Sequence, residues 1–225
     1  ESNMNIFIVS YHPEPKSFNG ALRDTAVTTL ESQGYTVRVS DLHAQDFSPI
    51  SGRHNFTTVQ NENYFKQQLE EIHATESGGF SEGIETELKN LEWCDLMIWQ
   101  FPLWWFGLPA PLKGWVDRVF AMGRTYGNGK FYQDGVFKGK RAMLSLTTGG
   151  PEAAYLPDGF NGDIMGILRP IHRGMLAFVG FDVLPPHIAY GPAHLDDSER
   201  TQLLADYEQR LLKLETEQSL TIGTY

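Results

Sequence analysis

The residues best suited to chemistry begin with the segment 102–107, which reads Pro-Leu-Trp-Trp-Phe-Gly. It follows the apolar run 95–100, and because Pro102 cannot continue a central strand, we expect the chain to turn there. The backbone N–H groups of residues 103–107 would then lack strand partners and would lie among three aromatic faces. Such a surface suits a flat heteroaromatic ligand with polar edges, for example a flavin ring. Packing into the core or a subunit interface is the alternative.

A second candidate is the segment 11–21, which follows the apolar run 5–10. Ser17 or Asn19 can cap a helix there, and the free N–H groups of its first turn would attract an anion. His12 and Lys16 would add positive charge beside that helix. A plain capped helix is the structural alternative.

A third candidate is the segment 147–155, which follows the run 141–147. Gly149 and Gly150 would let a ligand approach the backbone closely, although a tight turn explains them equally well. In the common 2-1-3-4-5 order of a doubly wound sheet, the strands before these three segments are neighbours. Ligands of such sheets bind at the carboxyl ends of the strands. We therefore expect the three segments to form one site, with phosphate on the first segment and a ring between the other two.

The elements that must position these segments follow an alternating pattern. Near-continuous hydrophobicity predicts buried parallel strands over 5–10, 35–40, 95–100 and 141–147, with a weaker one over 181–184. Amphipathic patterns predict helices over about 19–33, 83–92, 108–121, 163–179 and 198–217, with a short helix over 63–73. Alternation of strand and helix predicts an α/β doubly wound parallel sheet with helices on both faces. The polar segment 43–80 and the segment 122–139, rich in glycine and aromatic residues, fall outside this plan and are candidates for specialised roles.

Length and composition limit the class of protein. The 225 residues suit one domain, 1–225, and no apolar run approaches the ~20 residues of a membrane span. The net charge of -10 disfavours nucleic acid and anionic membranes as partners. The single cysteine, Cys94, allows no internal disulfide, which fits a cytoplasmic protein. Residues 1–3 resemble an expression remnant, and we expect no signal peptide. The 7 histidines show no metal-ligand spacing, so we expect no metal site.

Three motifs together carry a family resemblance: Tyr-His-Pro followed by Ser-Phe-Asn-Gly-Ala within 11–21, the run 101–120, and Thr-Thr-Gly-Gly at 147–150. The run 101–120 reads Phe-Pro-Leu-Trp-Trp-Phe-Gly-Leu-Pro-Ala-Pro-Leu-Lys-Gly-Trp-Val-Asp-Arg-Val-Phe and is long enough to be specific. The chain resembles the NAD(P)H:quinone oxidoreductase (DT-diaphorase) family from Met4 to about Leu214. That resemblance implies a flavodoxin-like fold, bound FAD and a homodimer.

The resemblance also implies roles for individual residues. The flavin pyrophosphate would be held by His12, Ser17, Phe18, Asn19 and Ala21. The flavin ring would contact Pro102, Leu103, Trp104, Trp105, Phe106, Thr147, Thr148, Gly149, Gly150 and Tyr155. The adenine pocket, built from both chains, would use Ile50, Asp117, Arg200 and Leu204. The wall that the partner subunit contributes to the substrate pocket would use Tyr126, Asn128 and Phe178.

Tyr155 and Asn161 are the catalytic candidates, and the second departs from the animal members of the family, which have histidine there. Asparagine can donate a hydrogen bond but cannot carry the proton, so Tyr155, water or a nearby group would have to compensate. Asn128 replaces a family tyrosine and Trp104 a glutamine, which points to a different substrate preference.

The implied activity is two-electron reduction of a quinone or a similar small electrophile by NAD(P)H. Hydride would pass to flavin N5 and then to the quinone in ping-pong order. Two alternatives remain open at this point: a flavodoxin-type electron carrier, and a redox-sensing regulatory subunit of an ion-efflux system. FMN in place of FAD, and the choice between NADH and NADPH, also stay open.

Overall fold

The computed structural model describes residues 3–224, and within them six strands form one sheet in the order β2-β1-β3-β4-β5, with β6 beside β4. All pairings are parallel. The strands are β1 (Asn5–Ser10), β2 (Thr36–Asp41), β3 (Leu96–Pro102), β4 (Arg141–Thr148), β5 (Asp182–Val183) and β6 (His187–Tyr190). The predicted strand order and the four main strands are confirmed. Of the supposed expression remnant 1–3, the first two residues lie outside the described range.

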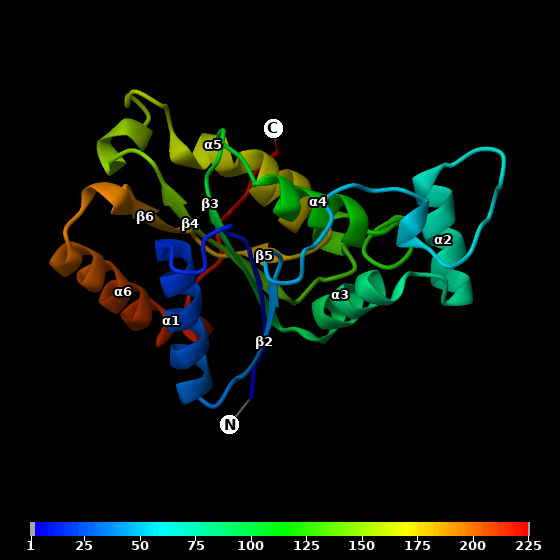
Figure 1. Cartoon of the computed structure of the whole chain (residues 1–225), viewed down its shortest axis with the longest axis horizontal. Coiled ribbons are helices and arrows are strands. Elements are labelled where there is room, and N and C mark those ends of the chain that lie inside the picture. The colour runs from blue at the N-terminus through cyan, green and yellow to red at the C-terminus, as the bar shows by residue number, and fades with distance from the viewer. Residues whose placement is uncertain (1–2, 225) are drawn as a thin grey trace.

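Helices cover both faces of the sheet (Figure 1). They are α1 (Phe18–Ser32), α2 (Gln67–Ser77), α3 (Glu82–Trp93), α4 (Ala110–Val119), α5 (Ile164–Ile171) and α6 (Asp197–Leu211). Successive side chains of a strand point to opposite faces, so Ile6 and Ile8 pack under α1 and α6, whereas Phe7 and Val9 pack in the cluster under α3, α4 and α5. The predicted doubly wound architecture is therefore confirmed.

Four predicted elements need correction. The helix predicted over 63–73 is α2 at 67–77, because Asn61 forms a turn with the backbone N–H groups of Asn63 and Tyr64. The helix predicted over 163–179 is α5 followed by a π-helix at His172–Ala177, next to Pro170, whose missing N–H breaks the regular ladder.

The other two corrections concern the carboxyl-terminal part. The strand predicted over 181–184 pairs only at Asp182–Val183, and sequence reasoning missed β6, whose four residues follow two prolines. The helix predicted over 198–217 is α6 at 197–211, which starts with a capping box between Asp196 and Glu199.

The two irregular segments adopt defined structures. Segment 43–80 leaves the end of β2 and extends with α2 to the right side of Figure 1. It returns through a bridge between Phe56 and Phe80. Segment 122–139 makes a tight turn in which Asn128 and Gly129 both have positive φ, with Lys130 N donating to the carbonyl of Gly127.

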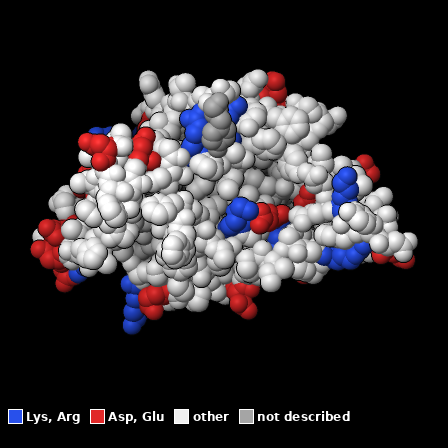
Figure 2. Space-filling view, turned by 90° about the horizontal axis from the view of Figure 1, so that it is seen from above, with Lys and Arg blue, Asp and Glu red and all other residues white. Residues whose placement is uncertain are grey.

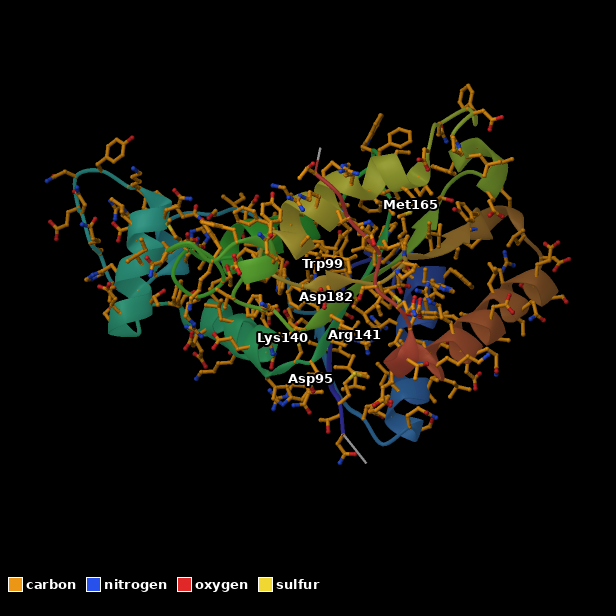
Figure 3. All side chains as sticks on the ribbon, turned by 180° about the vertical axis from the view of Figure 1, so that it is seen from behind. Asp95, Trp99, Lys140, Arg141, Met165 and Asp182 are labelled. Atoms are coloured by element: carbon orange, nitrogen blue, oxygen red, sulfur yellow. The ribbon has the colours of Figure 1, made fainter. Side chains whose placement is uncertain are left out.

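Charged side chains gather at the amino edge of the sheet, opposite the candidate site (Figure 3). Asp95, Lys140, Arg141 and Asp182 lie there, and Lys140 Nζ donates to the backbone carbonyl of Glu92 at 2.8 Å. Arg141 reaches the carbonyls of Leu214 and Glu217 at 3.1 and 3.3 Å. Lys140 thus ties the start of β4 to the end of α3, and Arg141 ties it to the carboxyl-terminal segment. Residues 3–224 contain no helix with the length and hydrophobicity needed to cross a bilayer.

Close backbone packing joins α4 to segment 43–80 at Gly114. A Cβ atom there would lie 2.2 Å from Pro49 Cα and 2.4 Å from Pro49 O. Gly114→Ala should therefore lower the free energy of unfolding by about 3 kcal/mol, since backbone must move. Gly83→Ala in α3 is the matched control, because nothing lies within 4 Å of its Cβ position, and it should stabilise by up to about 1 kcal/mol. Urea unfolding measures both, and equal effects would contradict this packing argument.

Candidate functional site

A pocket of about 460 Å³ opens at the carboxyl edge of the sheet, between the amino end of α1 and the ends of β3 and β4. All three candidate segments contribute to it, as predicted from the strand order. Its lining comprises His12, Ser17, Phe18, Asn19, Pro102, Leu103, Trp104, Thr147, Thr148, Gly149, Pro192, Ala193 and Arg200. Pro192 and Ala193 were missed, because they follow the unpredicted β6; the Gly-Pro pair at 191–192 was the available signal.

Ser17 caps the amino end of α1, and its Oγ accepts a hydrogen bond from Gly20 N at 3.1 Å. Among the described residues, no acceptor is found for the backbone N–H groups of Phe18 and Asn19. These two donors face the start of the helix, where the helix dipole also favours negative charge. The predicted anion site therefore has the required geometry. Ala21, one position further, donates its N–H to Ser17 O.

His12 contributes a donor to this site and not the positive charge predicted for it. Burial is the main cause that lowers the pKa of His12 below its usual value, although Glu14 opposes the shift. Its Nδ1 accepts the backbone N–H of Glu14 at 3.0 Å. In the neutral ring the proton then lies on Nε2, which can donate to an anion.

A buried chain of polar side chains underlies the pocket. Ser145 Oγ donates to Gln100 Oε1 at 2.5 Å, and Gln100 Nε2 donates to Asn19 Oδ1 at 3.0 Å. Asn19 Nδ2 in turn donates to Thr147 Oγ1 at 2.9 Å. This chain fixes the first turn of α1 against the ends of β3 and β4. It gives Asn19 a structural role in addition to the predicted contact with a ligand.

The aromatic segment forms a tight turn, in which Gly107 N donates to Trp104 O at 3.0 Å. Its central residues, Trp105 and Phe106, have φ values of 51° and 59°. Two positive φ angles define a turn that asparagine and glycine normally occupy, so two aromatic residues here are strained. One part of the prediction was wrong: Leu103 N also has a partner, Thr147 O at 2.9 Å. The strand thus continues to Pro102 and turns only afterwards.

The aromatic side chains of this turn remain exposed. Trp104 contacts the rings of Tyr11 and His12 edge-on and lines the pocket. Trp105 is 97% exposed and Phe106 is 49% exposed. The core interpretation of this segment is therefore excluded, whereas a ligand or a second subunit would bury these rings.

Gly149, Gly150, Tyr155 and Asn161 lie together after β4. A Cβ atom on Gly149 would meet nothing within 4 Å, and on Gly150 it would lie 3.4 Å from the Tyr155 ring. Tyr155 is buried, and its ring lies 5.9 Å from that of Tyr190. Asn161 N donates to Ala154 O at 2.7 Å, so the loop returns Asn161 to the neighbourhood of Tyr155.

Arg200 and Leu204 differ in their relation to the pocket. Arg200 lines it and donates to the carbonyls of Pro192 and Leu195 at 3.1 and 2.6 Å. Leu204, one turn further along α6, packs against the core under that helix.

The remaining predicted residues lie elsewhere on this chain. Asp117, Tyr126 and Phe178 line a second cavity of about 430 Å³, and Asn128 lines a neighbouring one. Ile50 is 70% exposed. Their predicted roles in a partner's site stay predictions.

The strain in the aromatic turn can be measured. Trp105→Gly should raise the free energy of unfolding by about 1 kcal/mol, because glycine adopts positive φ without cost and an exposed ring loses no burial. Chemical denaturation of the protein without ligand tests this. A loss of stability would show that the ring makes a stabilising contact in the free protein.

Comparison with known proteins agrees with this geometry. A family model described as a flavodoxin-like fold matches residues 4–212. Ribosyldihydronicotinamide dehydrogenase [quinone] of Mus musculus is 42% identical over 96% of this chain and 94% of its own. NAD(P)H dehydrogenase [quinone] 1 of Cavia porcellus is 43% identical over 91% of this chain and 74% of its own. A Klebsiella pneumoniae structure assigned as a quinone reductase, 38% identical, superposes with a TM-score of 0.93 over 96% of this chain and 87% of its own. The chain therefore belongs to the flavodoxin-like NAD(P)H:quinone oxidoreductase family.

Proposed function

We propose that this protein catalyses two-electron reduction of quinones by NAD(P)H through a bound flavin. One observation carries the proposal: the pocket joins an anion-binding helix terminus to an exposed aromatic turn at the carboxyl edge of the sheet. The chain is also 42–43% identical to relatives named as quinone dehydrogenases.

The residues present fit a flavin. The free N–H groups of Phe18 and Asn19 and the Nε2–H of His12 would hold its phosphate groups. Trp104 supplies an aromatic face, and the open space beside Gly149 admits the edge of a ring. A flavin bound there would supply the capacity to accept hydride from a nicotinamide and to pass it to a quinone.

Tyr155 and Asn161 support the reaction at the edge of this pocket. Tyr155 lies beside Gly150, and Asn161 is held next to Ala154 by its backbone hydrogen bond. The backbone N–H groups of Gly149 and Gly150 have no acceptor among the described residues. Donors placed where negative charge develops lower the barrier of a hydride transfer. Asn161 can donate there through its amide, whereas Tyr155 can also exchange a proton.

FAD is the proposed cofactor, and a homodimer the proposed assembly. Arg200, Pro192 and Ala193 extend the pocket along the start of α6, where a larger nucleotide would lie. Asp117, Tyr126, Asn128 and Phe178 lie apart from this pocket, which suits residues that complete the site of a second subunit. NAD(P)H and the quinone would use the same face of the flavin ring in turn, which gives ping-pong kinetics. The buried free thiol of Cys94 fits a cytoplasmic location.

The first experiment is an anaerobic titration of the FAD-loaded protein. NADH, NADPH and ribosyldihydronicotinamide are added separately, followed by menadione, while the visible flavin band is recorded. Rapid bleaching and full recovery would support the proposed reaction and rank the reductants. A bound flavin that none of them bleaches would favour a carrier or a regulatory subunit.

Tyr155→Phe tests the role of the hydroxyl. We expect the rate of bleaching by NAD(P)H to fall by about 10- to 100-fold, since one donor to developing charge is lost, while FAD content stays the same. Stopped-flow absorbance measures the rate, and Tyr190→Phe, which removes the hydroxyl of the neighbouring ring, is the matched control. An unchanged rate in Tyr155→Phe would remove that hydroxyl from the mechanism.

A further inference from the structure

Glu71 is a buried carboxylate in α2 that no motif singled out, and it has no ion-pair partner among residues 3–224. Its Oε1 accepts the backbone N–H of Met122 at 3.0 Å, and its Oε2 accepts Gln67 Nε2 at 3.3 Å. Burial raises the pKa of Glu71 to about 7, against the opposing effect of these two donors. Its charge therefore changes near neutral pH.

Gln67 connects the Glu71 carboxylate to α4, because its amide contacts both. Its Nε2 also donates to Asp117 O at 2.9 Å, and its Oε1 accepts Ser51 Oγ at 2.7 Å. Asp117 O belongs to the last turn of α4, where carbonyls lack partners within the helix. The orientation of the Gln67 amide thus supplies a cap for α4.

Glu71 and its contact Gln67 line one cavity, of about 430 Å³, which we call the second cavity, and its other contact, Met122, lines the neighbouring cavity. Asp117, Tyr126 and Phe178 line the second cavity together with Glu71, and Gln68 Nε2 donates to Tyr126 Oη at 2.9 Å. Figure 2, seen from above, shows a hollow near the middle of this face with a basic and an acidic group side by side next to it. An ionised carboxylate fixes the end of α4 and the start of segment 122–139, which meet at this cavity.

Protonation of Glu71 favours a different arrangement. A protonated Oε2 becomes a donor, and it would face Gln67 Nε2, which is also a donor. Rotating the Gln67 amide by half a turn offers an acceptor to Glu71, but it withdraws Nε2 from Asp117 O and Oε1 from Ser51. The cap of α4 is then lost, because the Gln67 amide cannot donate to Asp117 O in the orientation that accepts from protonated Glu71.

We propose that Glu71 is a positioning residue: its ionised form holds the wall of the second cavity, with Asp117 on α4 and the substrate-facing Tyr126, and its protonated form releases that wall. This inference rests on the proposed function, in which the second cavity faces the substrate of the partner subunit. It predicts that quinone binding weakens as the pH falls through neutrality.

Other titratable groups packed around Glu71 behave differently. Burial favours the neutral form of Glu70, but the backbone N–H groups of Gln60 and Asn61 and the charge of Arg53 outweigh it and lower its pKa, so Glu70 stays ionised. Burial raises the pKa of Tyr126, which stays protonated. On α4, Asp117 pairs with Lys113 at 2.7 Å. The wall segment 174–179 contributes no titratable residue to the cavity, and His73 on α2 is tested directly below.

The decisive experiment measures KM for menadione and kcat between pH 6 and 8.5 in four proteins: the wild type, Glu71→Gln, His73→Gln and Glu87→Gln. Glu87 is the matched control, a buried glutamate of raised pKa that accepts from Ser40 and Trp115 away from the cavity. In the wild type and both controls, KM should rise about three- to tenfold as the pH falls through 7, the effect of one hydrogen bond. Glu71→Gln should show the high KM at every pH with kcat unchanged.

Amide hydrogen exchange of the ligand-free protein at pH 7.5 gives an independent readout. Segment 117–126 should exchange several-fold faster in Glu71→Gln than in the wild type or Glu87→Gln. If the wild type reduces no quinone, the proposed function fails, and exchange alone decides the role of Glu71. A Glu71→Gln variant with the wild-type KM profile, or with wild-type exchange in this segment, would overturn the inference.

Discussion

The hydrogen bonds of the Gln100 side chain are the interaction on which the rest of the site depends. Gln100 lies in the middle strand and is buried, so both ends of its amide need partners. Ser145 satisfies one end and Asn19 the other, and Asn19 continues to Thr147. These contacts fix α1, β3 and β4 in one arrangement, because a shift of any element would leave a buried polar group unpaired. The pocket at the carboxyl edge keeps its shape for the same reason.

The aromatic turn 102–107 projects into solvent from the hydrogen-bonded ends of β3 and β4. Pro102 ends β3, Leu103 still pairs with Thr147, and only then does the backbone enter two successive residues of positive φ. Strain of this kind persists where the surroundings over-determine the conformation, and it gathers at sites of binding. The exposure of Trp105 and Phe106 indicates that the free chain lacks the surface that would cover them. A flavin, a substrate and a second subunit are the candidates that the proposed function supplies.

The second cavity differs in how its shape is maintained. The side chains of the Gln100 network described above are amides and hydroxyls, which do not change charge near neutral pH, whereas the network around Glu71 includes a carboxylate whose charge changes near neutrality. The chain thus combines a pocket of constant shape for the cofactor with a wall that a proton can alter. In a homodimer both would contribute to one active site.

The sequence by itself determined the four main strands and the segments that meet at the carboxyl edge, because the hydrophobic pattern of parallel strands and the chemistry of glycine, proline and helix caps are local. It also identified the family, through the run 101–120. Only the tertiary structure decided the remaining features. The lowered pKa of His12 depends on its burial, which outweighs the opposing effect of Glu14. Strand β6 was too short to be distinguished before its pairing with β4 was known. Glu71 in sequence is one acidic residue on a polar helix. Its importance arises from contacts with Met122 and with Gln67, which reaches Asp117, since the free energy of a buried charge depends on what surrounds it in space.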